Sequence, residues 1–426
     1  MNQSTITTAT DNVRRRRGNA FDRWLRRRLL ARLTGLKRAG LTIRDPEGVT
    51  FLGQPGAELQ AEVSVHDLHF WRLMATGGSV GAAEAYMAGL WDTPDPVAVV
   101  QVLARNRHVM PELERGGARV SNALLGLWHA HNRNSLNGSR RNISAHYDLG
   151  NEFFSAWLDE HMMYSSALFL DAEESLEQAQ LNKLDRICQK LDLAPEDHLL
   201  EIGSGWGGLA IHAARHYGCR VTTTTISREQ FEYAREAVAR AGLADRVEVL
   251  MRDYRDLDGE YDKLVSVEMI EAVGHQYLDT YMGAIDRLLR PGGLALIQAI
   301  TIEDSRYRSA LSNIDFIKRY IFPGSFIPSV SAISGAMARS SRLGLIELAD
   351  FGNSYALTLA RWRQRFESAW DRISEMGFDE SFRRRWRWYL AYCEGGFRER
   401  AISDVHLLLA GPDWRASSAA GLTGGS

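Results

Sequence analysis

The residues best suited to chemistry begin with a glycine-rich turn. An apolar segment over His198–Ile202 is followed by Gly203, Gly205 and Gly208, and then by small and apolar residues typical of a helix. Glycines let a backbone turn tightly and approach a ligand closely, and the start of the next helix offers free N–H groups. The pattern predicts a ligand site where a strand ends.

The spacing of these glycines also fits a dinucleotide fingerprint, which by itself is a weak signal. Glu201 stands just before the turn, where its carboxylate can face the cationic end of a ligand, whereas a dinucleotide turn must accept a pyrophosphate. No acid ends the second strand, Cys219–Thr225, where a ribose-binding carboxylate is expected. The ordered segments 253–257, 261–268 and 288–293 resemble the class I methyltransferase core. S-adenosylmethionine is therefore the predicted ligand.

Ser227 and Gln230 have two compatible interpretations. Ser-x-x-Gln at the start of a helix over 227–241 forms a capping box, and Gly242 is a suitable residue to end that helix. The same two side chains follow a strand of the predicted sheet and can contact the cofactor. The sequence leaves both roles open.

The elements that must position these residues alternate between strand and helix from residue 143 onward, which predicts a parallel sheet covered on both faces. The predicted fold is α/β, a Rossmann-like class I methyltransferase sheet with helical lipid-site insertions. A small α+β domain precedes it, with strands over 48–52 and 58–65 and helices over 67–75 and 96–104. The predicted division is 1–39, a disordered and basic amphipathic N-terminus; 40–135, the small domain; 136–412, the methyltransferase domain; and 413–426, a flexible tail. Residues 105–142 are the linker candidate.

Composition excludes several classes of protein. The 51 basic and 53 acidic residues nearly balance, so no global field favours nucleic acid. Cys188, Cys219 and Cys393 lie far apart, which indicates a reducing compartment and no structural metal. No apolar run is long enough for a signal peptide or a membrane span, and a cytoplasmic location is expected.

The N-terminal segment is the main exception to this balance. Residues 14–38 carry eleven Lys or Arg against one acid, Asp22, and an apolar stripe runs through them at helical spacing. Such a helix can lie on an anionic membrane surface, or it can pack on its own domain. Both interpretations remain open.

Several motifs together resemble the cyclopropane fatty acid synthase family, which includes the mycolic acid cyclopropane synthases. They are His146–Phe154, Met163–Ser166, Glu201–Gly208, Thr225–Gln230, Asp253–Leu257, Glu271–Gly274, Lys318–Gly324, Phe351–Leu359 and Phe397–Arg400. Together they span about residues 140 to 410, in an order specific to the family.

The resemblance implies transfer of a one-carbon unit from S-adenosylmethionine to the double bond of a phospholipid acyl chain, which gives a cyclopropane. It implies that a set of turn, strand-end and aromatic residues surrounds the cofactor: Tyr147, Tyr164, Ser165, Glu201, Gly203, Ser204, Gly205, Thr225, Ser227, Gln230, Asp253 and Tyr254. The implied catalytic residues are Glu271, Tyr355, Gln298 and Ser166.

Family members hold a bicarbonate ion near the transferring methyl group, and the resemblance places Glu271 and Tyr355 at two of the matching positions. This chain departs from the family pattern at other positions around the ion. Ser166 replaces a cysteine, while Ala272 and Gln298 each replace a histidine. A hydroxyl and an amide can bind an anion but cannot carry a histidine's positive charge. Bicarbonate binding and the identity of the product therefore stay open.

The chemistry itself requires two further kinds of group. Methyl transfer leaves a carbocation that favours aromatic faces and a site without water, for which Tyr164, Tyr320, Phe322 and Tyr355 are candidates. Glu271 is the leading candidate to manage the departing proton, directly or through a bound bicarbonate. Glu268 is a second acid, in a region where an unpaired carboxylate is unfavourable, and contact with the cofactor is one role for it.

Three alternatives accompany this prediction. The first is a methylene- or methyl-branched product from the same substrate. The second is an inactive lipid-binding protein that uses the basic N-terminus and the Arg/Trp-rich segment 361–387. The third, a nucleic-acid methyltransferase, lacks a base-flipping motif. The predicted partners are unsaturated phospholipids at the inner face of the membrane and no nucleic acid, with a homodimer left open.

Overall fold

The computed structural model describes residues 19–107 and 149–416. By its contacts the chain divides into two compact units, Met1–Arg119 and Val120–Ser426. Tyr147 and most of the predicted linker lie outside the described residues.

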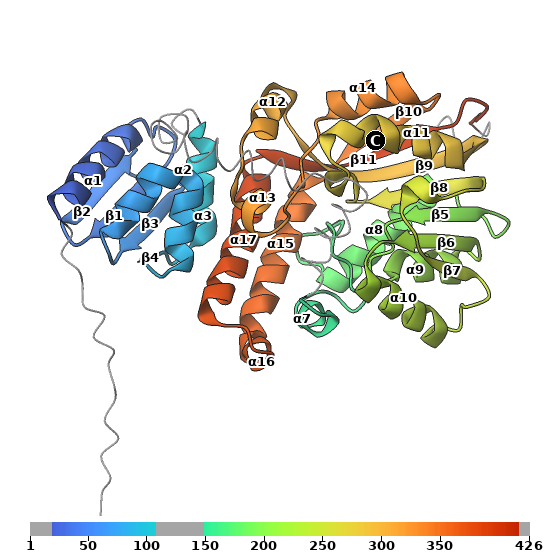
Figure 1. Ribbon diagram of the computed structural model, residues 1–426, viewed down its shortest axis with the longest axis horizontal. Helices are drawn as coiled ribbons and strands as arrows, with labels where there is room; N and C mark the ends of the chain where they lie inside the picture. The colour runs from blue at the N-terminus through green and yellow to red at the C-terminus, as the bar shows by residue number, and fades with distance from the viewer. Residues whose placement is uncertain (1–18, 108–148, 417–426) are drawn as a thin grey trace, which may run out of the picture. The chain divides into compact units, whose positions relative to one another are not determined.

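The first unit places helices beside a four-stranded sheet (Figure 1). The strand order is β2-β1-β3-β4, with β1 parallel to β3 and the other pairs antiparallel. Its elements are α1 (Ala20–Leu33), β1 (Gly40–Asp45), β2 (Gly48–Gly53), β3 (Gln60–Val65), α2 (His69–Met87), β4 (Trp91–Asp92) and α3 (Pro96–Arg105).

Helix α1 contributes its apolar stripe to the core of this unit. Leu29, Leu30 and Leu33 are buried. Asn19 and Asp22 form a reciprocal capping box at its start, and Asp22 also pairs with Arg72 of α2. The aromatic side chains at the other side of the helix, Phe21 and Trp24, remain exposed, by 54% and 43%.

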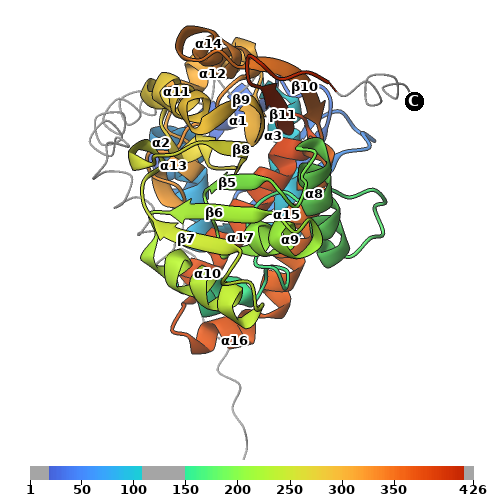
Figure 2. The ribbon, with the colours of Figure 1, turned by 90° about the vertical axis from the view of Figure 1, so that its right-hand side faces the viewer.

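The second unit is built on a seven-stranded sheet of order β10-β11-β9-β8-β5-β6-β7 (Figures 1 and 2). The strands are β5 (His198–Ile202), β6 (Arg220–Thr225), β7 (Val247–Met251), β8 (Tyr261–Val267), β9 (Leu289–Ile302), β10 (Gly344–Asp350) and β11 (Ile402–Ala410). Strands β9, β8, β5, β6 and β7 run parallel, whereas β11 is antiparallel to both β9 and β10. The predicted α/β class is confirmed.

Alternate residues of the sheet face two different helical layers. Leu199 of β5 belongs to a core with α8 and α9, while the next residue, Leu200, belongs to a core with α11 and α14. The helices of this unit are α7 (Asn151–Ser155), α8 (Leu176–Lys190), α9 (Gly208–His216), α10 (Arg228–Arg240), α11 (Leu278–Leu288), α12 (Asp304–Ser312), α13 (Phe316–Tyr320), α14 (Val330–Ser340), α15 (Gly352–Ser368), α16 (Trp370–Glu375) and α17 (Glu380–Arg398). Short 3₁₀ turns cover 254–256, 270–272 and 275–277.

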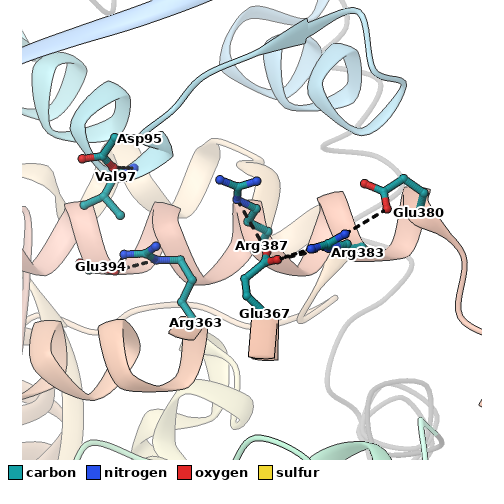
Figure 3. Close-up of polar contacts among 8 residues, drawn as sticks. All are labelled: Asp95, Val97, Arg363, Glu367, Glu380, Arg383, Arg387 and Glu394. Carbon is teal, nitrogen blue, oxygen red and sulfur yellow. Dashed lines mark hydrogen bonds and ion pairs between the residues drawn. The ribbon is translucent and has the colours of Figure 1, made fainter. Parts of the chain in front are cut away.

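The Arg/Trp-rich segment 361–387 serves this packing. Helices α15 and α17 lie side by side, and Arg383 and Arg387 of α17 reach Glu367 of α15 (Figure 3). Arg363 pairs with Glu394 in the same way. Because these arginines already have intramolecular partners, the segment gives little support to the lipid-binding alternative.

No helix within residues 19–107 and 149–416 is both long and apolar enough to cross a membrane.

Candidate active site

The glycine turn joins β5 to α9 and has an unusual backbone. Gly203, Gly205 and Gly207 have φ values of 101°, 48° and 93°, a region that L-residues with a side chain rarely adopt. A Cβ atom on Gly205 would meet no atom within 4 Å, so this side of the turn is open to a ligand. A Cβ on Gly208 would lie 2.7 Å from the carbonyl oxygen of His161, so that glycine is required by packing.

The end of the next strand, β6, is held by its own side chains. The Thr225 hydroxyl donates to Oε1 of Gln230 (2.9 Å) and accepts from the backbone N–H of Ser227 (3.1 Å). Ser227 Oγ accepts from the backbone N–H of Gln230 (3.3 Å) and caps α10. The capping role is therefore present, although the Gln230 side chain bonds to Thr225 instead of closing the box.

Asp253 follows β7 and meets a cation. Arg255 donates from Nε and Nη2 to the two carboxylate oxygens, at 2.8 and 2.6 Å. This two-point ion pair neutralises the Asp253 carboxylate, which is almost fully buried. The adjoining Tyr254 is also buried. The ends of the parallel strands β5, β6 and β7 thus bring Gly203, Thr225 and Asp253 to the same end of the sheet.

Glu201 points to the α8 side of the sheet. Thr223 Oγ1 donates to its carboxylate at 2.5 Å, across the β5–β6 pair. Burial raises the pKa of Glu201 to about 8, against the hydrogen bond from Thr223 and the charge of Lys183. A carboxyl with this pKa keeps its proton at neutral pH, so the predicted carboxylate for a cationic ligand is uncharged there.

Tyr164, with Ser165 next to it in the chain, belongs to a group of aromatic side chains that we call the aromatic wall: Tyr164, Phe322, Tyr355 and Trp362. The Tyr164 hydroxyl shares a hydrogen bond with that of Tyr389 (2.9 Å), and its ring lies 5.4 Å from Trp362 and 6.4 Å from Phe322 between centroids. Ser165 accepts a 2.6 Å hydrogen bond from the buried ammonium of Lys183. Tyr320 contacts Phe316 at 5.6 Å and has a cation–π contact with Arg319.

Three acids form what we call the carboxylate cluster. Glu268 directly follows β8, Glu271 lies in the 3₁₀ turn 270–272, and Asp404 lies near the start of β11. The Glu268 carboxylate accepts three hydrogen bonds: from the Ser166 backbone N–H (2.7 Å), from Gln298 Nε2 (2.8 Å) and from the Tyr355 hydroxyl (2.7 Å). Three of the four predicted catalytic residues therefore meet at one carboxylate that was not among them.

Gln298 joins two members of the cluster. Its amide nitrogen donates to Glu268 and to Asp404, both at 2.8 Å, and its oxygen faces Nε2 of His406 at 3.2 Å. Burial lowers the pKa of His406 to about 3, so this imidazole is neutral and donates to the amide oxygen. Gln298 is itself fully buried, directly opposite His406 in the β9–β11 pair.

Glu271 stands apart from this arrangement. Its Oε1 accepts from the Ile300 N–H at 2.6 Å, while its buried Oε2 has no partner within the described part of the chain. Burial, with repulsion from Glu268, raises the pKa of Glu271 to about 8. A carboxyl in this state is a neutral acid at pH 7, which weakens its predicted role as the direct base.

Sequence reasoning missed Asp404, His406 and Lys183. Asp404 and His406 alternate within the otherwise apolar strand 402–410, which places both on the face that carries Gln298. Lys183 is fully buried beside Leu184 and Ile187 on α8, and burial lowers its pKa to about 8. An ionisable residue among mainly apolar neighbours is the signal that the sequence offers in each case.

Within residues 19–107 and 149–416, no group of three or more His, Cys, Asp or Glu is arranged to hold a metal ion.

Comparison with known proteins agrees with this architecture. Residues 134–407 match the family model described as mycolic acid cyclopropane synthetase. The chain belongs to this family. Tuberculostearic acid methyltransferase UfaA1 of Mycobacterium tuberculosis is 41% identical over 80% of this chain and 81% of its own length. The cyclopropane-fatty-acyl-phospholipid synthase of Escherichia coli K12 is 37% identical over 80% of this chain and 86% of its own.

A solved structure extends the match to the fold. Mycolic acid cyclopropane synthase CmaA1, in complex with SAH and CTAB, has a TM-score of 0.59 and 27% identity, covering 64% of this chain and 98% of its own. The predicted membership in the cyclopropane synthase family, the class I fold and the S-adenosylmethionine-dependent methyltransferase activity are confirmed. This protein is therefore a methyltransferase that acts on unsaturated lipid chains.

Proposed function

We propose that this methyltransferase transfers a one-carbon unit from S-adenosylmethionine to the double bond of an unsaturated phospholipid acyl chain and closes a cyclopropane ring. One observation carries the proposal. The Tyr355 hydroxyl bonds to Glu268, while its ring stacks on Phe397 at 4.4 Å and contacts Trp362 at 6.1 Å. Aromatic faces and a proton acceptor thus occur together, as the methylation of an alkene requires.

The cofactor end of the site suits the donor. The open face at Gly205 lets a ligand approach the backbone, and Gly203, Thr225 and Asp253 end three adjacent strands at the same edge. When bound, S-adenosylmethionine supplies an activated methyl group on a sulfonium. We assign its binding to this edge, together with Ser204, Ser227, Gln230, Tyr254, Tyr164 and Ser165; Tyr147 lies outside the described residues.

The aromatic wall supports the developing cation. Trp362 lies between Tyr164 and Tyr355, at 5.4 and 6.1 Å between ring centroids. The Trp362 side chain is fully buried and does not contact solvent. These faces offer negative electrostatic potential to a cation in a site that excludes water.

The product depends on which proton leaves. Loss from the added methyl closes the ring, whereas loss from a neighbouring position leaves a branched chain that still carries a double bond, as a methylene or a shifted alkene. The second candidate is therefore a methylene- or methyl-branched product. The replacements at Ser166, Ala272 and Gln298 favour it, as does the similarity to an enzyme named for tuberculostearic acid.

The first unit offers a surface for the lipid. Phe21 and Trp24 stack at 5.8 Å on the exposed side of α1, and the Arg28 guanidinium lies 5.1 Å from the Trp24 ring. Exposed aromatics beside arginines suit the interface of an anionic membrane. This supports the proposed attachment at the inner face of the membrane.

The test is incorporation of label from methyl-deuterated S-adenosylmethionine into vesicles of an unsaturated phospholipid, read by mass spectrometry of the fatty acids. A saturated, ring-containing product that has lost one deuterium supports cyclopropane formation. A chain with a methyl branch that keeps all three deuteria, or one with an exocyclic methylene that keeps two, establishes the second candidate. Absence of label from every lipid product, in protein that binds the cofactor, contradicts the proposed function.

A further inference from the structure

The Glu268 carboxylate fills the place where a bound anion would meet the predicted ion-binding residues. Of the residues that the family resemblance assigns to bicarbonate, Ser166, Gln298 and Tyr355 all have a donor on Glu268, at 2.7 to 2.8 Å. A bicarbonate ion at these donors would have to displace the Glu268 side chain, which already occupies all three. The residues present do not fit a second anion.

We propose that Glu268 replaces the bicarbonate ion in this enzyme and is itself the base that accepts the substrate proton. The inference rests on the proposed function for the identity of the substrate, although the replacement of the ion does not depend on it.

The backbone shows that Glu268 is held in this position against its own preference. Its φ of 47° lies in the left-handed region, which disfavours a residue with a side chain. Its N–H donates to the carbonyl of Gln298 at 2.9 Å, so main chain and side chain both connect it to β9. Such outliers concentrate at functional sites, where surrounding contacts maintain them.

Glu268 also has the capacity to act. A carboxylate offers about four lone-pair positions, and the three hydrogen bonds leave one on Oε2, the oxygen that Tyr355 contacts. Glu268 keeps part of its surface exposed, whereas Ser166, Gln298 and Asp404 are fully buried. Burial raises the pKa of Glu268, as it does that of Glu271, but the three donors and the charge of Lys183 oppose this rise at Glu268. Glu271 has one donor, on one oxygen.

The chemical step then balances without an added ion. The π electron pair of the alkene forms a bond to the methyl carbon as the bond from that carbon to sulfur breaks, and its electron pair stays on sulfur. The neighbouring alkene carbon becomes cationic. Glu268 takes a proton from the added methyl group, and the released C–H pair closes the ring. The resulting carboxylic acid returns its proton to solvent.

Three variants test this role. Glu268→Gln keeps the shape and should lower turnover by about 10²-fold or more, with unchanged affinity for S-adenosylmethionine. Glu268→Gly removes the carboxylate and the backbone strain together, so it should fold, lose activity similarly and regain at least about tenfold when bicarbonate or formate is added. The control Glu394→Gln alters a buried, arginine-paired carboxylate elsewhere and should show no response to bicarbonate.

A binding measurement decides the matter even if the lipid proposal fails. Bicarbonate should raise the thermal unfolding midpoint of Glu268→Gly but not that of the wild type, because only the variant has space for the ion beside three donors. Wild-type turnover should change by less than about twofold between carbonate-free and bicarbonate buffer. Bicarbonate-dependent wild-type activity, wild-type turnover by Glu268→Gln, or equal bicarbonate stabilisation of wild type and Glu268→Gly would overturn the inference.

Discussion

The two ends of the active site are built in opposite ways. The donor end uses a short, continuous turn, in which glycine backbones with positive φ leave space for a ligand. The other end is the carboxylate cluster with its hydrogen-bond partners Ser166, Gln298 and Tyr355, which come from separate parts of the chain. The donor end therefore depends on the backbone conformation of its glycines, and the carboxylate cluster depends on the charge and hydrogen bonds of its side chains.

This difference predicts how each end responds to substitution. Added bulk should harm the donor end by blocking a ligand, with little dependence on pH. Loss of one charge should harm the cluster by removing chemistry, while the cofactor still binds. The predictions below test this separation, in order of decreasing effect.

The largest effect is expected at Gly205. Replacement by valine places a β-branched side chain on the open side of the turn, so S-adenosylmethionine affinity should fall by more than about 10²-fold by calorimetry. The strained backbone alone should destabilise the fold by about 1–3 kcal/mol.

Gly242→Val is the matched control. Gly242 also has a positive φ, 70°, and a Cβ there also meets no atom within 4 Å, but it follows α10 away from the turn. It should lose similar stability and keep its cofactor affinity. Equal affinity loss in both variants would show that strain, not a blocked approach, explains Gly205.

The same contrast explains which parts of the molecule the sequence could reveal. The donor end was predictable because Gly203 to Gly208 are adjacent in the chain and their spacing reports the turn directly. The cluster was not, because Ser166, Glu268 and Asp404 meet only through the order of the strands and helices. Glu268 could be noticed as a costly acid, but its partners could not be read from its neighbours.

The first unit shows a similar limit. The strand over 40–45 went unpredicted, since a short run with Arg44 and Asp45 gives little periodic signal. The helix predicted over 67–75 is followed, after a kink at Gly78 with a φ of 56°, by a second helical segment of α2 that ends at Met87. Two adjacent glycines suggest a helix end, but buried side chains such as Val80 and Tyr86 continue the packing beyond them.

Within the cluster, Glu271 should matter less than Glu268. Because its pKa of about 8 leaves it protonated at pH 7, Glu271→Gln replaces one neutral group by another and can still accept from Ile300. We expect turnover at pH 7 to fall by less than about tenfold, measured as methyl transfer to lipid. A fall as large as that of Glu268→Gln would instead return the role of base to Glu271.

Buried ionisable groups in and near the cluster should also make the free energy of unfolding depend on pH. Burial raises the pKa of Glu201 and Glu271 from 4.5 to about 8, so the folded chain retains protons that the unfolded chain releases. Their contribution is therefore complete below about pH 4.5 and is lost as pH rises to about 8. Lys183, whose pKa falls from 10.5 to about 8, adds stability between about pH 8 and 10.5 instead.

Thermal unfolding between pH 5 and 9 measures this effect. Glu271→Gln should reduce the slope of the free energy of unfolding against pH by about one proton relative to the wild type. The other ionisable groups that face this site, Glu268, Asp404, Tyr355 and His406, remain in the variant. An unchanged slope would show that Glu271 does not bind its proton more tightly in the folded chain.

The smallest effect separates the two roles of Ser227. Its hydroxyl caps α10, so Ser227→Ala should lower the free energy of unfolding by about 1 kcal/mol in chemical denaturation. Ser175→Ala is the matched control, because Ser175 caps α8 in the same manner, accepting from the Gln178 N–H at 3.1 Å, and is exposed. Both variants should lose similar stability, since each leaves one N–H at a helix start without its acceptor. If Ser227 also contacts the donor, only Ser227→Ala should weaken S-adenosylmethionine binding, by about three- to tenfold for one neutral hydrogen bond. Equal affinity in the two variants would confine Ser227 to the cap and leave cofactor binding at this strand end to its neighbours Thr225 and Gln230.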